Sequence, residues 1–188
     1  MSLTAAQAID LLSDPKYQTP EGLLNLVRQV SVATSADKPG ATTLLYSGNM
    51  LADGSGPSTQ SIAEYISKNH KNQIRVIDST EVAKFLTNTK FADFLKEVIP
   101  DQKIRTAWLY DATKGPWAVA SEAFVRGAQG PIETFSSFAS AHRTFSVIEV
   151  PVALDTPTIT TIGGLKRQDL VDYRASLVQK TLGQLVTC

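Results

Sequence analysis

The chain has 188 residues, of which 43% are hydrophobic and 19% are charged, and this composition is typical of one soluble globular domain with a buried core. Its 18 Lys and Arg residues balance its 18 Asp and Glu residues, which argues against binding to nucleic acid or to an acidic membrane surface. The single cysteine, Cys188, excludes a disulfide within the chain. His70 and His142 lie too far apart in sequence for a familiar metal-ligand spacing, so we expect no metal site.

The N-terminus carries no charged segment followed by an apolar one, and no apolar run approaches the roughly 20 residues that span a bilayer. We therefore expect no signal peptide and no association with a membrane. A cytoplasmic protein fits these observations, and so does one that is secreted or delivered by a non-classical route.

Residues 1–40 predict a helical preface that carries no chemistry. Residues 4–14 fit a helix capped by Thr4. A second helix is expected to begin at Thr19-Pro20-Glu21, where a capping hydroxyl, a proline and an acidic residue follow one another. Apolar residues then recur at helical spacing up to Val30, and residues 35–40 predict a polar linker.

Beyond residue 40, predicted strands alternate with predicted helices. Strands are expected at residues 42–46, 74–78, 106–111, 145–152 and 158–162. Helices are expected at residues 58–69, 80–86, 91–98, 117–128 and 167–182. This alternation predicts an α/β fold, with a helical N-terminal lobe and a largely parallel short sheet flanked by helices, in one domain over residues 1–188.

A glycine-rich loop at residues 49–57 separates the first predicted strand from the next helix. A strand, a glycine loop and a helix N-terminus in this order can hold a phosphate through backbone N–H groups. The loop lacks the Walker and dinucleotide-binding spacings, so an ordinary surface loop explains it equally well.

Trp117, Ser121 and Phe124 follow one another at positions i, i+4 and i+7, so a helix places them on one face. A tryptophan and a serine near a helix start can stack against a heterocycle and bind a phosphate or a ribose. The alternative is that Trp117 and Phe124 simply pack in the core.

Two carboxylates are candidates for chemistry. Glu149 lies five positions after Thr144 in a predicted extended segment, and a carboxylate beside a sugar can stabilise positive charge at the anomeric carbon. Asp78 ends its predicted strand, at the edge of an α/β sheet where ligands bind. The alternatives are a solvent-facing strand acid and a helix cap. Ser140, Ser146 and His142 match no nucleophile motif.

Four segments in this order resemble the ADP-ribosyl cyclase / NAD glycohydrolase family, in the manner of a bacterial toxin-like member without disulfides. They are Leu45-Tyr46-Ser47-Gly48, Ile77-Asp78-Ser79-Thr80, the Trp117, Ser121 and Phe124 set, and Thr144-Phe145 with Glu149. The resemblance covers residues 41–165, and it implies an ADP-ribosyl cyclase-like fold whose NAD-binding and catalytic part is residues 41–188.

The resemblance also implies the role of each residue. Glu149 would be the catalytic glutamate that stabilises an oxocarbenium-like state, Trp117 would stack near the nicotinamide, and Asp78 would contact its amide. The implied substrate-binding residues are Tyr46, Ser47, Ser121, Phe124 and Thr144. NAD would be the substrate, with no cofactor, and an immunity or inhibitor protein would be a partner if the chain is a toxin or effector.

The chain departs from the animal enzymes at the first segment, where Tyr46 stands in place of a tryptophan. Cyclisation requires the adenine to fold back onto aromatic walls, so this change favours hydrolysis to nicotinamide and ADP-ribose, with cyclic ADP-ribose as a minor product. An ADP-ribosyltransferase is one alternative, although its Glu/Gln-x-Glu motif is missing. A non-catalytic nucleotide-binding interaction domain is the other.

Overall fold

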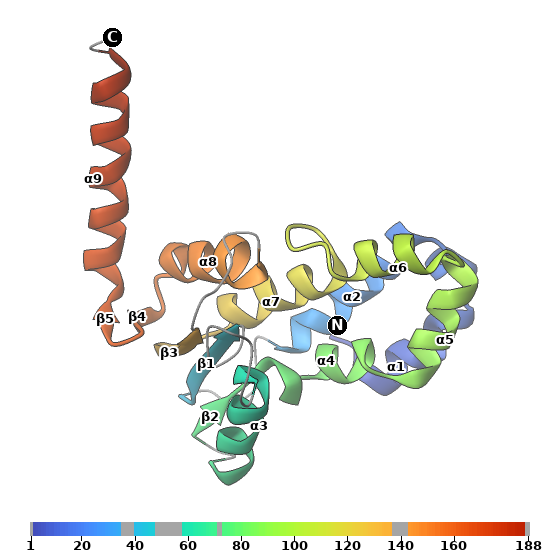
Figure 1. Ribbon diagram of the computed structural model, residues 1–188. Helices are drawn as coiled ribbons and strands as arrows, with labels where there is room; N and C mark the ends of the chain where they lie inside the picture. Colours follow the sequence, from blue (N-terminus) through green and yellow to red (C-terminus); the bar gives the residue numbers. More distant parts are fainter. Residues whose placement is uncertain (1, 35–39, 48–57, 71–72, 137–142, 187–188) are drawn as a thin grey trace.

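The structure, a computed structural model, describes residues 2–34, 40–47, 58–70, 73–136 and 143–186. These parts form an α/β fold in which helices cover a five-stranded sheet of order β2-β1-β3-β4-β5 (Figure 1). Only β5 runs antiparallel to its neighbour. The predicted class, a mostly parallel sheet flanked by helices, is therefore confirmed. The strands are β1 (Thr42–Ser47), β2 (Ile74–Arg75), β3 (Gly130–Ser136), β4 (Ile159–Ile162) and β5 (Leu165–Lys166).

The described residues contain helices of three kinds. The α-helices are α1 (Ala5–Asp10), α2 (Pro20–Thr34), α3 (Thr59–Asn69), α4 (Glu81–Leu86), α5 (Thr89–Val98), α6 (Gln102–Leu109), α7 (Pro116–Arg126), α8 (Val150–Asp155) and α9 (Arg167–Val186). Short 3-10 turns are η1 (Leu11–Ser13), η2 (Pro15–Tyr17) and η3 (Ile77–Ser79), and η4 (Phe145–Glu149) is a π-helical turn.

The two faces of the sheet carry different helices because successive strand residues point to opposite sides. Leu45 of β1 and Ile132 of β3 belong to the large core that also contains residues of α2, α4, α7 and α8. Leu44 points the other way and packs with Ala63 of α3. Since α2 contributes Val27 to the large core, the N-terminal helices form part of the cover of the sheet.

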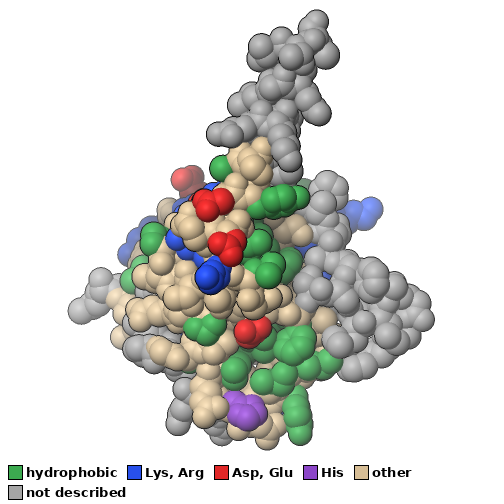
Figure 2. All heavy atoms as spheres, turned by 90° about the vertical axis from the view of Figure 1, so that its left-hand side faces the viewer, with side chains coloured by type: hydrophobic (Ala, Val, Ile, Leu, Met, Phe, Trp, Pro, Cys, Tyr) green, Lys and Arg blue, Asp and Glu red, His purple; other side chains and the backbone are tan. Residues whose placement is uncertain are grey.

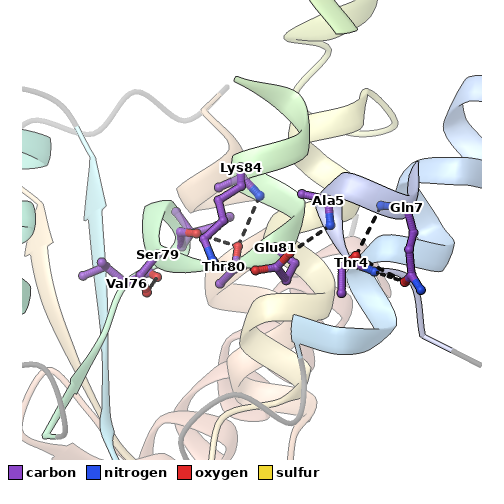
Figure 3. Close-up of polar contacts among 10 residues, drawn as sticks. Thr4, Ala5, Gln7, Val76, Ser79, Thr80, Glu81 and Lys84 are labelled. Carbon is purple, nitrogen blue, oxygen red and sulfur yellow. Dashed lines mark hydrogen bonds and ion pairs between the residues drawn. The ribbon is translucent and has the colours of Figure 1, made fainter. Parts of the chain in front are cut away.

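The N-terminal helix is fastened to α4 by polar contacts (Figure 3). The backbone N–H of Gln7 donates to Thr4 Oγ1 at 3.3 Å, and the N–H of Thr4 donates to Gln7 Oε1 at 2.9 Å, which is a complete capping box. The N–H of Ala5 donates to Glu81 Oε2 at 2.9 Å. Within α4, Glu81 also pairs with Lys84. The Glu81 carboxylate therefore contacts both α1 and α4.

The chain connections change direction between the neighbouring strands β1 and β3. In the sheet, β1 lies between β2 and β3. Along the chain, β1 is followed by α3, whereas β3 is followed by η4 and α8. α3 and α8 belong to the cores on opposite faces. Ligands of open α/β sheets bind where two adjacent parallel strands lead to opposite faces. The carboxyl ends of β1 and β3 meet this description.

Two predicted strands are helices in the structure. Residues 106–111 lie in α6 and the turn after it, because Asp101 caps a helix by accepting from the N–H groups of Lys103 and Ile104. Residues 145–152 form η4 and the start of α8, with Pro151 in the first turn of α8. Both runs are rich in β-branched or aromatic residues, and local capping and packing outweigh that propensity.

Other differences are smaller. Residues 130–136, for which no strand was predicted, form the central strand β3. β2 stops at Arg75 because η3 follows, and the helix expected at residues 4–14 becomes 3-10 turns after Asp10. Residues 35–39 of the predicted linker lie outside the described residues, as do the glycine loop, Ser140, His142 and Cys188.

The last helix, α9, extends away from the remainder of the chain (Figure 1). Its first residue, Arg167, donates to the carbonyls of Leu154 at 2.7 Å and Ile159 at 3.1 Å.

On the face drawn in Figure 2, acidic and basic side chains lie among hydrophobic and neutral ones. No described helix combines the length and the hydrophobicity needed to cross a membrane.

Candidate active site

A cavity of about 370 Å³ lies at the carboxyl ends of β1 and β2. A second hollow of about 530 Å³ continues from it, and the two share Tyr46, Gln60, Tyr110 and Glu149. The structure brings all eight predicted site residues to this pair of hollows. Those lining the first are Tyr46, Asp78, Trp117, Ser121, Phe124 and Glu149, and those lining the second are Tyr46, Ser47, Thr144 and Glu149.

Glu149 is the most unusual side chain in the cavity. It is only 8% exposed, and its Oε2 has no hydrogen-bond partner among the described residues. Burial raises the pKa of Glu149 to about 7, against an opposing effect of hydrogen bonding from the Ser121 hydroxyl. A buried carboxyl that lines a cavity and has one oxygen without a partner can accept a hydrogen bond from a ligand.

Glu149 owes its position to the π-helical turn η4. The N–H of Val150 donates to the carbonyl of Phe145, five residues earlier, and this wide turn ends at the carboxylate. A turn of this kind keeps Thr144 and Glu149 on one side, and both line the second hollow. π-helical turns of a single ring are frequent at functional sites.

Asp78 also lines the cavity, and two donors hold its carboxylate. The Tyr46 hydroxyl donates to Asp78 Oδ2, and Gln60 Nε2 donates to Oδ1 at 3.2 Å. Burial raises the pKa of Asp78, the hydrogen bond from Tyr46 lowers it, and the charge of Glu64 raises it further. Burial also raises the pKa of Tyr46, as does its bond to Asp78, so the tyrosine stays protonated. Asp78 is therefore a fixed acceptor.

The turn that carries Asp78 is stabilised by its own hydroxyl groups (Figure 3). Ser79 Oγ donates to the carbonyl of Val76 at 2.8 Å, and Thr80 Oγ1 donates to the carbonyl of Ile77 at 2.6 Å. Thr80 also caps α4 by accepting from the N–H of Ala83. These bonds end β2 early and turn the side chain of Asp78 into the cavity.

We expect Tyr46→Phe to lower the free energy of unfolding by about 1–3 kcal/mol at pH 7, because the half-buried Asp78 carboxylate loses a donor. The loss should shrink as the pH falls and Asp78 becomes protonated, and urea unfolding at several pH values measures it. Tyr110→Phe is the matched control, because Tyr110 is 63% exposed. An equal effect of both changes would show that the bond to Asp78 contributes nothing.

Helix α7 supplies one wall of the cavity through Trp117, Ser121 and Phe124, as their spacing predicted. Phe124 is fully buried. The guanidinium of Arg75 makes a cation–π contact with its ring, and Arg75 Cζ lies 4.1 Å from the ring centroid. Arg75 Nη1 also donates to the carbonyl of Phe124 at 2.7 Å. Phe124 is therefore part of the core as well as a wall, whereas Trp117 is only half-buried.

The start of α7 allows only glycine. A Cβ added to Gly115 would lie 2.6 Å from the carbonyl oxygen of Trp108 and 2.8 Å from that of Asp111. This close approach sets where α7 begins relative to α6, and with it where Trp117 enters the cavity. Pro116 then occupies the first position of the helix.

Sequence reasoning missed two residues that line both hollows. Tyr110 follows α6, and it was assigned to a buried strand, although the cap at Asp101 is a signal for a helix there. Gln60 lies in the first turn of α3, two residues after the capping residue Ser58. Its place behind the glycine-rich loop was the available signal.

Within the described residues, no three His, Cys, Asp or Glu side chains lie together in a way that could hold a metal ion. No protein-family model matches the chain, and neither the curated proteins nor the solved structures contain a significant match. The functional inference therefore depends on the geometry of the hollows and on the residues that line them.

Proposed function

We propose that the protein is an NAD glycohydrolase, which cleaves NAD to nicotinamide and ADP-ribose. The observation that carries this proposal is Glu149, a buried carboxyl with an unpartnered oxygen, which shares its cavity with Trp117 and Ser121. A flat cationic ring and a ribose with two hydroxyls are the chemical groups that such a set can receive.

In the proposed reaction, the bond between the nicotinamide nitrogen and the ribose C1′ breaks, and its electron pair leaves with the nicotinamide. The Glu149 carboxylate accepts hydrogen bonds from the ribose hydroxyls and stabilises the positive charge that develops at C1′. Water then adds to C1′ and loses a proton, which gives ADP-ribose. Trp117 stacks against the nicotinamide ring, and Ser121 holds the carboxylate in place.

The second hollow would receive the phosphates. Ser47 and Thr144 offer hydroxyls there, and Arg143 supplies a positive charge. The N-terminus of α3 also opens on this side, and its dipole favours an anion. The unliganded Glu149 is partly protonated near pH 7, and the cationic ring of NAD would favour its charged form.

Hydrolysis is favoured over cyclisation by the state of Tyr46. Its hydroxyl is bonded to Asp78, so its ring is fixed and is not free to turn onto a folded-back adenine. We propose that ADP-ribose is the main product and that cyclic ADP-ribose is minor at most.

The direct test is incubation of the full chain with NAD, with the products separated by chromatography. Nicotinamide and ADP-ribose in equal amounts are the expected result. Intact NAD after long incubation, with binding still measurable by calorimetry, would replace the proposal with a nucleotide-binding domain. Nicotinamide release only when a protein acceptor is added, with label on that acceptor, would indicate a transferase.

Trp117→Ala should lower kcat/KM for NAD by about 10- to 100-fold, because a stacked aromatic contact of about 1–3 kcal/mol is lost. Trp117→Phe should restore most of the activity, since the ring remains. Trp108→Phe is the control, because Trp108 packs near the core and lines neither hollow. Activity in Trp117→Ala equal to that of the unmutated chain would remove Trp117 from the site.

A further inference from the structure

A groove of about 510 Å³ lies between α2 and α7, on the side of α7 that faces away from the candidate active site. Helix α7 contributes Val119, Glu122, Ala123 and Arg126 to the groove. These positions are offset by about half a turn from Trp117, Ser121 and Phe124, as expected for opposite faces of one helix. The groove is therefore separate from the NAD site.

The charges that line the groove are mostly positive. They are Arg28, Lys114, Arg126 and a single acid, Glu122. Arg126 bonds to Glu122 at 2.9 Å, and this pair is neutral. Among the described residues, neither Arg28 nor Lys114 has a carboxylate within ion-pair distance, so the groove keeps two positive charges. Arg28 Nη1 donates to Asn25 Oδ1 at 2.6 Å, and Lys114 lies near enough to Asp111 to contribute to the lowered pKa of that carboxyl.

A buried hydroxyl faces the same groove. Ser31 is only 2% exposed, and its Oγ has no hydrogen-bond partner within the described parts of the chain. A serine within a helix either points to solvent or bonds to the carbonyl four residues earlier, so a buried hydroxyl without a partner is unusual. Burial without a partner is unfavourable unless a ligand completes the bond.

We propose that this groove binds a small anionic amphiphile, a carboxylate attached to a short aliphatic chain. Val32, Val119 and Ala123 supply an apolar floor for the chain. Arg28 and Lys114 complement the carboxylate, and Ser31 donates a hydrogen bond to it. The volume is within the range of about 300–1,000 Å³ that is typical of small-molecule sites.

The test is isothermal titration calorimetry of the full chain with decanoate at pH 7. We expect saturable binding of one molecule, and much weaker binding of 1-decanol or inorganic phosphate, each of which supplies only part of the recognised chemistry. Arg28→Gln with Lys114→Gln should weaken decanoate binding by about tenfold or more. Lys90→Gln with Lys103→Gln changes the net charge equally, away from the groove, and should leave binding intact.

Ser31→Ala separates a binding role from a structural one. We expect decanoate to bind several-fold more weakly, with no loss of thermal stability, because the hydroxyl makes no bond in the unliganded protein. No saturable binding of decanoate, equal binding of 1-decanol, or equal weakening by both charge pairs would overturn the proposal. Because the measurement is heat of binding and not NAD cleavage, its failure would leave the proposed activity untouched.

Discussion

Glu149→Gln should release nicotinamide from NAD more slowly than the unmutated chain by at least about a thousandfold, because the preorganised carboxylate is lost where positive charge develops. The amide has nearly the same size and can still meet the Ser121 hydroxyl, so the cavity should keep its shape. Initial rates of nicotinamide release at saturating NAD measure the effect. NAD binding should weaken much less than the rate falls.

Glu133→Gln is the matched control, because Glu133 is exposed on β3 and lines neither hollow. It should cleave NAD at the rate of the unmutated chain. If Glu149→Gln also retains full activity while the unmutated chain cleaves NAD, the substrate is right but the catalytic residue is wrong. Glu149→Asp should fall between the two, because its carboxylate is set back by one methylene.

The fold was predictable from sequence where caps and apolar spacing agree. Ser58 before α3, Thr80 before α4 and Gly115-Pro116 before α7 mark helices that the structure contains. Prediction failed where the intrinsic strand preference of a segment was opposed by a helix cap just before it. The run at residues 106–111 has strand-like composition, but the Asp101 cap starts a helix that buries none of its residues.

The eight predicted site residues lie together at the two hollows, although the backbone of one segment was predicted wrongly. In a strand, Thr144 and Glu149 would point to opposite faces, because an odd number of positions separates them. The π-helical turn places them on one side instead. The same spacing of two site residues along the sequence can therefore occur in a strand or in a helical turn, and it does not determine the backbone conformation. Gln60 and Tyr110 could not be found in this way, since neither stands in a recognisable motif.

Glu149→Gln should also raise the free energy of unfolding at pH 8 by about 3 kcal/mol, and leave it unchanged at pH 4. Burial raises the pKa of Glu149 from 4.5 to about 7, so the folded state favours the neutral form. Below pH 4.5 the group is protonated in both states and carries no penalty. Between pH 4.5 and about pH 7, the free-energy cost of the buried Glu149 charge grows with pH. Above about pH 7 this cost is constant, because Glu149 is ionised in both the folded and the unfolded state.

Urea unfolding of the two proteins at pH 4, 6 and 8 measures this difference, and Glu133→Gln should show none of it. A glutamine that is less stable than Glu149 at pH 8 would mean that the carboxylate is well solvated or paired, which would contradict the burial argument. The predicted gain has a functional meaning. Without a ligand, the buried charge of Glu149 destabilises the folded protein. In the proposed function, the cationic ring of NAD would offset this cost, so the same burial would favour NAD binding in the cavity.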